Sequence, residues 1–169
     1  MSAQLAGLRR LLDREAGLLV RRLRGFTEAR YAAEAPPFAS RAAVARHLAQ
    51  ALANTAQGIE STGSNEEPSW RKMPDLPPLA LADALAVTAN DLVAALEPTL
   101  TMSVAVDAVA AGALAEVLLH RRDLDGSPPG WESAAAALEV LTPGAVASPR
   151  LLLIEAQHRC PAYGPWRSS

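Results

Sequence analysis

The stretch that decides the fold runs from Thr101 to Leu124 and reads TMSVAVDAVAAGALAEVLLHRRDL. It is apolar around most of a helical circumference, whereas a helix on a protein surface is apolar along one stripe only. Alanine loses no side-chain entropy on entering a helix and leucine loses little, so this composition favours helix over strand. We therefore expect a helix over these residues, placed at the centre of a helical bundle.

Three further segments have the spacing of amphipathic helices. Leucines at steps of three and four predict a helix from about Ala3 to beyond Leu23. Ser40 is a suitable N-cap for a second helix, Arg41 to about Gly58, and a third leucine register runs from Pro78 to about Glu97. Because no segment has the two-residue period of a strand, the sequence predicts an all-α, four-helix up-and-down bundle.

The remaining segments predict a long loop and a C-terminal extension. Residues 61–77 lack any period and contain three prolines, which is typical of a loop. One short helix is expected over 131–141. Ser148-Pro149 predicts the start of another, since proline is favoured at the first helical position, and that helix should end near Arg159. The tail from Cys160 onward is expected to be irregular.

Length and composition bound the class of protein. With 169 residues the chain fits one domain, 1–169, made of a bundle core over 1–125 and a helical extension over 126–160. A net charge of -2 without a basic stripe argues against nucleic-acid binding. The single cysteine, Cys160, excludes an internal disulfide and is typical of a reducing compartment. No signal-peptide core or run of roughly 18 apolar residues is present, so we expect a cytoplasmic protein without a membrane partner.

A carboxylate and an imidazole stand four residues apart in the central helix, at Glu116 and His120. Residues at that spacing share one helix face and lie about 6 Å apart along the axis. A metal ion would offset the cost of a carboxylate in so apolar a helix. His47, on the apolar side of the predicted helix 41–58, would complete a set of two histidines and one carboxylate. Such a set leaves coordination positions open, as catalytic metal centres do.

Ordinary structural explanations compete with this metal site. A Glu–His pair at four-residue spacing is a common helix salt bridge, and a histidine on an apolar face is usually hydrogen-bonded within the core. Asp123 could orient His120, although Arg121 and Arg122 could equally well neutralise the aspartate. The run His158-Arg159-Cys160 could form a thiol with an activating imidazole, but adjacency in the chain says little about geometry.

Two stretches resemble a known family. Ala115–Leu124, AEVLLHRRDL, is similar to the Glu-x-x-x-His-x-x-Asp-Leu segment of mycothiol-dependent maleylpyruvate isomerases and of the wider DinB-like metal-binding superfamily. Phe38–Ala49, FASRAAVARHLA, resembles that family's second helix, which ends in a His-Leu pair. The resemblance covers most of residues 1–125 and implies a four-helix bundle with a divalent metal held by His47, Glu116 and His120.

The resemblance also implies a class of function. The expected cofactor is a divalent metal (zinc before nickel or iron), and mycothiol is the expected thiol cosubstrate. We therefore expect a thiol-dependent transferase or isomerase that acts on a small-molecule substrate or thiol. The Ala-rich composition with Arg in place of Lys fits a high-GC genome, compatible with a mycothiol-using actinobacterium.

Two departures from the family keep other functions open. Ala43 stands where the family has an aspartate, and the segment after Asp123 is shorter than the C-terminal domain of the isomerases. Maleylpyruvate isomerisation itself is therefore not expected. The alternative hypothesis is a non-catalytic helical bundle that has lost the metal site and serves homodimerisation. A third hypothesis is a metal-dependent hydrolase that uses activated water without any thiol.

Overall fold

The computed structural model describes residues 3–61, 71–97, 105–124, 136, 138–139 and 149–163. Their helices are α1 (Ala3–Arg24), α2 (Glu28–Ala32), α3 (Arg41–Glu60), α4 (Leu81–Ala95), α5 (Ala105–Leu124) and α7 (Pro149–His158). Two 3-10 turns, η1 (Pro78–Ala80) and η2 (Pro161–Tyr163), are also present among these residues. No strand occurs in the described part of the chain, so the predicted all-α class is confirmed.

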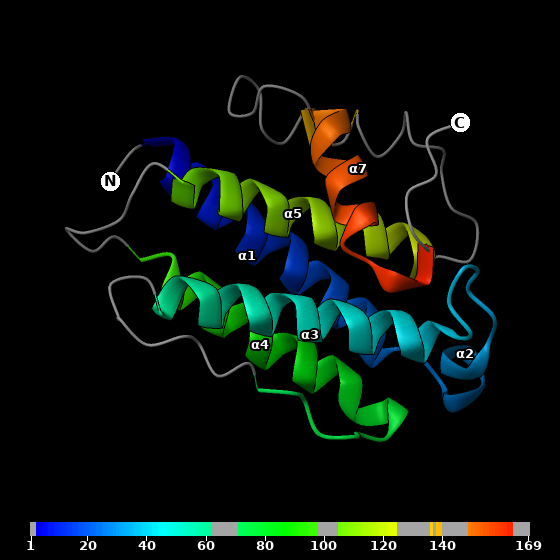
Figure 1. Ribbon diagram of the computed structural model, residues 1–169. Coiled ribbons are helices and arrows are strands. Elements are labelled where there is room, and N and C mark those ends of the chain that lie inside the picture. Colours follow the sequence, from blue (N-terminus) through cyan, green and yellow to red (C-terminus); the bar gives the residue numbers. More distant parts are fainter. Residues whose placement is uncertain are drawn as a thin grey trace.

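The four long helices α1, α3, α4 and α5 pack side by side (Figure 1). Both α1 and α3 pack against α4 and α5, which places α1 and α3 on opposite corners of the group. Figure 1 also shows that α1 and α5 run in one direction and that α3 and α4 run in the other. Consecutive helices therefore do not alternate in direction throughout, as they would in a simple up-and-down bundle.

Residues 71–77 explain why α3 and α4 run the same way. The amide of Arg71 donates to Gln57 near the end of α3, and the amide of Met73 donates to Gln50, two turns earlier. Arg46, one turn earlier again, donates to the carbonyl of Leu76 at 2.8 Å. The segment thus runs back along α3, from its C-terminal toward its N-terminal end, before α4 begins. Because these hydrogen bonds hold the segment there, α4 cannot begin beside the C-terminal end of α3.

The core is built from the leucine registers that the sequence indicated. In α1 the buried stripe includes Leu8, Leu12 and Leu19, each at most 1% exposed. Burial of each such side chain contributes about 1.5–3 kcal/mol. Helix α5 is buried on nearly every side over residues 113–120, because α1, α3 and α7 all pack against it. The all-round apolar pattern of α5 therefore reflects three packing partners.

The C-terminal extension lies on α5. Helix α7 begins at Pro149 as predicted, packs against α5 and leads into η2. The tail that was expected to be irregular after Cys160 therefore contains one 3-10 turn, in which the amide of Tyr163 donates to the carbonyl of Cys160. The short helix predicted over 131–141 falls mostly outside the described residues; positions 136, 138 and 139 are helical. The single-domain boundaries stay a prediction.

Candidate metal centre

His120 is the centre of the candidate site. Its side chain is fully buried in α5, and its Nδ1 lies 3.1 Å from Oδ2 of Asp123. Its Nε2 lies 3.2 Å from Oε2 of Glu116, one helical turn earlier. Nε2 of His120 and Oε2 of Glu116 are both buried. Neither has a hydrogen-bond partner, because the two atoms are close but not aligned for a hydrogen bond.

The surroundings of His120 favour a positive charge. Burial lowers the pKa of this imidazole, but its hydrogen bond with Asp123 and the negative charges of Glu116 and Asp123 outweigh that effect, and the pKa is raised. The pKa of Glu116 is lowered: burial raises it, but His120 and Arg159 outweigh burial. The negative charges of Glu116 and Asp123 would therefore favour either a proton or a metal ion at Nε2 of His120.

His47 reaches the same place from α3. The N-cap Ser40, whose Oγ accepts from the amide of Ala43 at 3.2 Å, fixes the start of this helix as predicted. Two turns later the ring of His47 lies with its centroid 4.7 Å from that of His120. Its Nε2 is buried without a hydrogen-bond partner. Burial, helped by the charge of His120, lowers the pKa of His47 to about 4, which keeps the ring neutral and able to act as a ligand.

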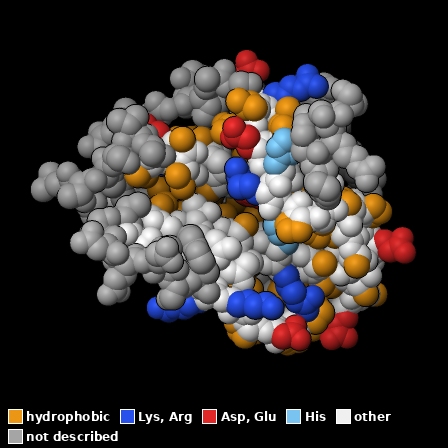
Figure 2. Space-filling model, viewed as in Figure 1, with side chains coloured by type: hydrophobic (Ala, Val, Ile, Leu, Met, Phe, Trp, Pro, Cys, Tyr) orange, Lys and Arg blue, Asp and Glu red, His pale blue; other side chains and the backbone are white. Residues whose placement is uncertain are grey.

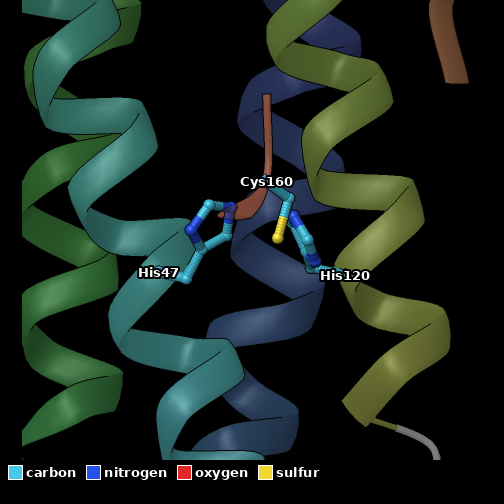
Figure 3. A group of neighbouring side chains, drawn as sticks. All are labelled: His47, His120 and Cys160. Carbon is cyan, nitrogen blue, oxygen red and sulfur yellow. The ribbon is translucent and has the colours of Figure 1, made fainter. Parts of the chain in front are cut away.

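The turn after α7 brings a thiol between the two imidazoles. Cys160 is fully buried, and its Sγ and one ring nitrogen from each of His47 and His120 all lie within 4.8 Å of one another. Figure 3 shows the sulfur directed into the space between the two rings. Burial raises the pKa of the thiol, while the amides of Ala162 and Tyr163 oppose that rise. We call His47, Glu116, His120 and Cys160 the buried cluster.

The neighbours of Cys160 hold this turn against α5. Arg159 donates from Nε to Oε1 of Glu116 at 3.1 Å, which leaves Oε2 directed at His120. Tyr163 donates its hydroxyl to Asp123, at 2.8 Å from both carboxylate oxygens. Burial and Asp123 together raise the pKa of Tyr163, so the phenol stays protonated and remains a donor. Both carboxylates of the α5 face are therefore bound from the C-terminal segment.

An aromatic ring closes one side of the buried cluster. The centroid of Phe38 lies 5.7 Å from that of His47 and 5.6 Å from that of His120. Phe38 also makes an edge contact with Tyr163. A ring in this position limits the access of water, and contacts within the cluster are stronger where water is excluded.

A surface cavity of about 670 Å³ reaches the cluster at His47. The pinned segment 71–77 forms one of its walls, and the volume is in the range of small-molecule sites. Two cations and one carboxylate line it, so a polar or anionic molecule would find partners there. The lining residues are Arg46, His47, Gln50, Lys72, Met73, Pro74 and Asp75.

Glu116 and His47 each lie beside His120, but the ligand atoms that all lie within 4.8 Å of one another are those of His47, His120 and Cys160, and the predicted set of His47, Glu116 and His120 stays a prediction. The structure also places Asp123 against His120, the orienting role considered from the sequence. The sequence offered His158 as an imidazole that could activate the thiol of Cys160. In the candidate centre the imidazoles near that thiol are those of His47 and His120. Sequence reasoning missed the roles of Arg159 and Tyr163; the only signal was an isolated cysteine directly after a predicted helix.

Comparison with models of protein families, with curated proteins and with solved structures finds no match to this chain. The resemblance to the DinB-like superfamily therefore rests on the residues of Ala115–Leu124 and Phe38–Ala49.

The surface carries weak signals only. On the face drawn in Figure 2, acidic and basic side chains are interspersed among apolar and neutral ones. Within the described residues one helical segment, Pro78–Ala95, is long and apolar enough to span a membrane by composition alone. Its leucines at 81, 85 and 92 are fully buried, and 33% of the segment is buried in all.

Proposed function

We propose that this protein is a metal-dependent enzyme that holds a divalent cation through His47, Glu116 and His120. The observation that carries the proposal is the set of three buried atoms without hydrogen-bond partners: Nε2 of His47, Oε2 of Glu116 and Nε2 of His120. An unsatisfied buried polar atom such as Nε2 of His47 costs about 1–3 kcal/mol, and a bound cation would remove that cost. The other two atoms lie 3.2 Å apart as an ion pair, and a cation there would take the place of a proton between them. Imidazole and carboxylate ligands suit zinc, nickel or iron, with zinc the first expectation.

The other residues of the centre prepare these ligands. Asp123 accepts from Nδ1 of His120 and so leaves Nε2 free to bind. His120, and then Arg159, keep Glu116 ionised, and Arg159 occupies the other oxygen of that carboxylate. A bound divalent cation supplies Lewis acidity and lowers the pKa of a thiol or water that binds to it. The cavity beside His47 would admit a small molecule as far as that residue.

We propose further that the reaction is a thiol-dependent transfer or isomerisation with mycothiol as cosubstrate. The support for this step is the resemblance of Ala115–Leu124 to the mycothiol-dependent family. Calorimetric titration of the zinc-loaded protein with mycothiol, and with S-methyl mycothiol as the matched control, tests it. We expect binding of the free thiol only; equal binding of both, or of neither, would remove the thiol from the proposal and leave the metal.

Metal analysis and thermal unfolding test the cation itself. We expect one zinc per chain in protein prepared without chelator, and an unfolding midpoint that rises with added Zn²⁺, because a native-state ligand stabilises by mass action. His120→Ala should lose both effects. His158→Ala is the matched control, since His158 is exposed on α7. A wild-type chain that stays metal-free after reconstitution and unfolds at one temperature with or without Zn²⁺ would refute the proposal.

A non-catalytic bundle is the second candidate, and one observation favours it. Arg159 already pairs with Glu116, and Asp123 already pairs with His120, so an imidazolium could satisfy this face of α5 without a metal. The same thermal experiment decides between the two candidates.

A further inference from the structure

The turn after α7 binds the face of α5 that carries Glu116, His120 and Asp123. Arg159 binds Glu116 and Tyr163 binds Asp123, and these two acids stand on either side of His120 in α5. Cys160, between the two clamping residues, is brought to His120 and His47. Its own backbone is fixed at both ends, because its amide donates to Gln157 and its carbonyl accepts from Tyr163.

We propose that Cys160 is a metal ligand, so that the C-terminal turn closes the cation site of His47, Glu116 and His120 with a thiolate. This inference rests on the proposed function and adds a fourth protein ligand to it. Formation of the metal–sulfur bond releases the thiol proton to solvent, and neither the sulfur nor the metal changes oxidation state. A site with sulfur and nitrogen ligands selects zinc or cobalt over magnesium or calcium.

Burial, together with the charges of Glu116 and Asp123, keeps Cys160 protonated in the metal-free chain, so a thiolate would form there only with a cation bound to it. Glu116 and Asp123 are already matched by the guanidinium groups of Arg159 and Arg122. A divalent cation would bring two further positive charges into a buried region, where unmatched charge is costly. The thiolate of Cys160 would cancel one of them. The amides of Ala162 and Tyr163, which face the sulfur, would stabilise its negative charge.

Closure by Cys160 has a consequence for catalysis. The sulfur lies between the two imidazoles, where a thiol cosubstrate would also have to bind (Figure 3). An external thiol must therefore displace the thiolate of Cys160 from the metal. Cys160 and the external thiol thus compete for the same coordination position.

The absorption spectrum of the full-length protein loaded with Co²⁺ tests the inference. We expect visible d–d bands of a low-coordinate site together with a thiolate-to-cobalt charge-transfer band in the near ultraviolet. Cys160→Ser and Cys160→Ala should keep the d–d bands and lose the charge-transfer band. Their zinc affinity should fall by more than the roughly 10–100-fold that loss of an outer-shell partner causes. His158→Ala should keep the whole spectrum.

The outcomes separate this inference from the proposed function. Wild-type d–d bands without a charge-transfer band would overturn the role of Cys160 and leave the metal site standing. Absence of any cobalt spectrum would overturn both. The wild-type spectrum decides the matter even where a Cys160 variant fails to fold. Added mercaptoethanol should restore the charge-transfer band in Cys160→Ala; failure to restore it would overturn the competition with external thiols.

Discussion

His120 is a buried imidazole that lies between two carboxylates. Its i+4 spacing from Glu116 made that pair predictable, because helix geometry alone places both on one face. The place of His47 on the apolar side of the predicted helix 41–58 made it a candidate partner, and the resemblance of two motifs supported that choice. The position of Cys160 was not predictable, because it depends on the bonds of Arg159 and Tyr163 to α5, which join residues about 40 apart.

Asp123 is expected to act on metal binding without touching the metal. Asp123→Asn weakens the acceptor at Nδ1 of His120 and removes the charge that orients the ring. We expect zinc affinity to fall about 10–100-fold, measured by competition with a chromophoric chelator. Asp13→Asn, at an exposed position of α1, is the control. Unchanged affinity in a folded Asp123→Asn chain would contradict the positioning role.

Tyr31 makes the free energy of unfolding depend on pH in the alkaline range. Burial first, and then the charge of Asp83, raise the pKa of this phenol, whose hydroxyl donates to the carbonyl of Leu23. Since the pKa of the folded state lies above that of the unfolded state, its contribution is complete below about pH 10 and is lost as pH rises further. Tyr31→Phe should therefore be less stable than wild type near neutral pH, and the difference should shrink at alkaline pH. Urea unfolding of both chains measures it; a constant difference would contradict this account.

At the scale of elements, leucine spacing and caps predicted α1, α3, α4, α5 and α7 to within a few residues, whereas the five-residue α2 was not predicted. The start of α3 at Arg41 and that of α7 at Pro149 agree with the sequence, because N-caps and N-terminal prolines act locally. The direction of α4 could not be predicted. It depends on side chains of α3 that bind the backbone of 71–77, and composition does not reveal such bonds.

Ser40 links local capping to the site, since it begins the helix that carries His47. Ser40→Ala removes the acceptor for the amide of Ala43 and should lower the free energy of unfolding by about 0.5–2 kcal/mol. Chemical denaturation measures the loss. Thr27→Ala, which uncaps the five-residue α2, is the comparison and should cost less, because a frayed α2 releases fewer buried side chains. Equal stability of Ser40→Ala and wild type would contradict the cap.

At the scale of the whole molecule, the described chain is a bundle in which Glu116, His120 and Asp123 gather at one corner, while the other buried polar residues of the described part, Glu15 and Thr88, lie on α1 and α4. At that corner α3, α5 and the turn after α7 meet, and the buried ionisable groups of the centre come from these three parts. The sequence predicted the class of fold because apolar periodicity is a local property. It could not predict that the extension completes the polar corner, because docking of α7 is a long-range event.

The three parts that meet at this corner are far apart along the chain, and that separation has a kinetic consequence. Contacts between distant segments must offset the entropy of closing the loops between them, so we expect them to form late on the folding pathway. Interactions absent from the transition state slow unfolding and leave the folding rate almost unchanged. A cation bound at this corner would therefore slow unfolding of the native chain and leave its folding rate almost unchanged.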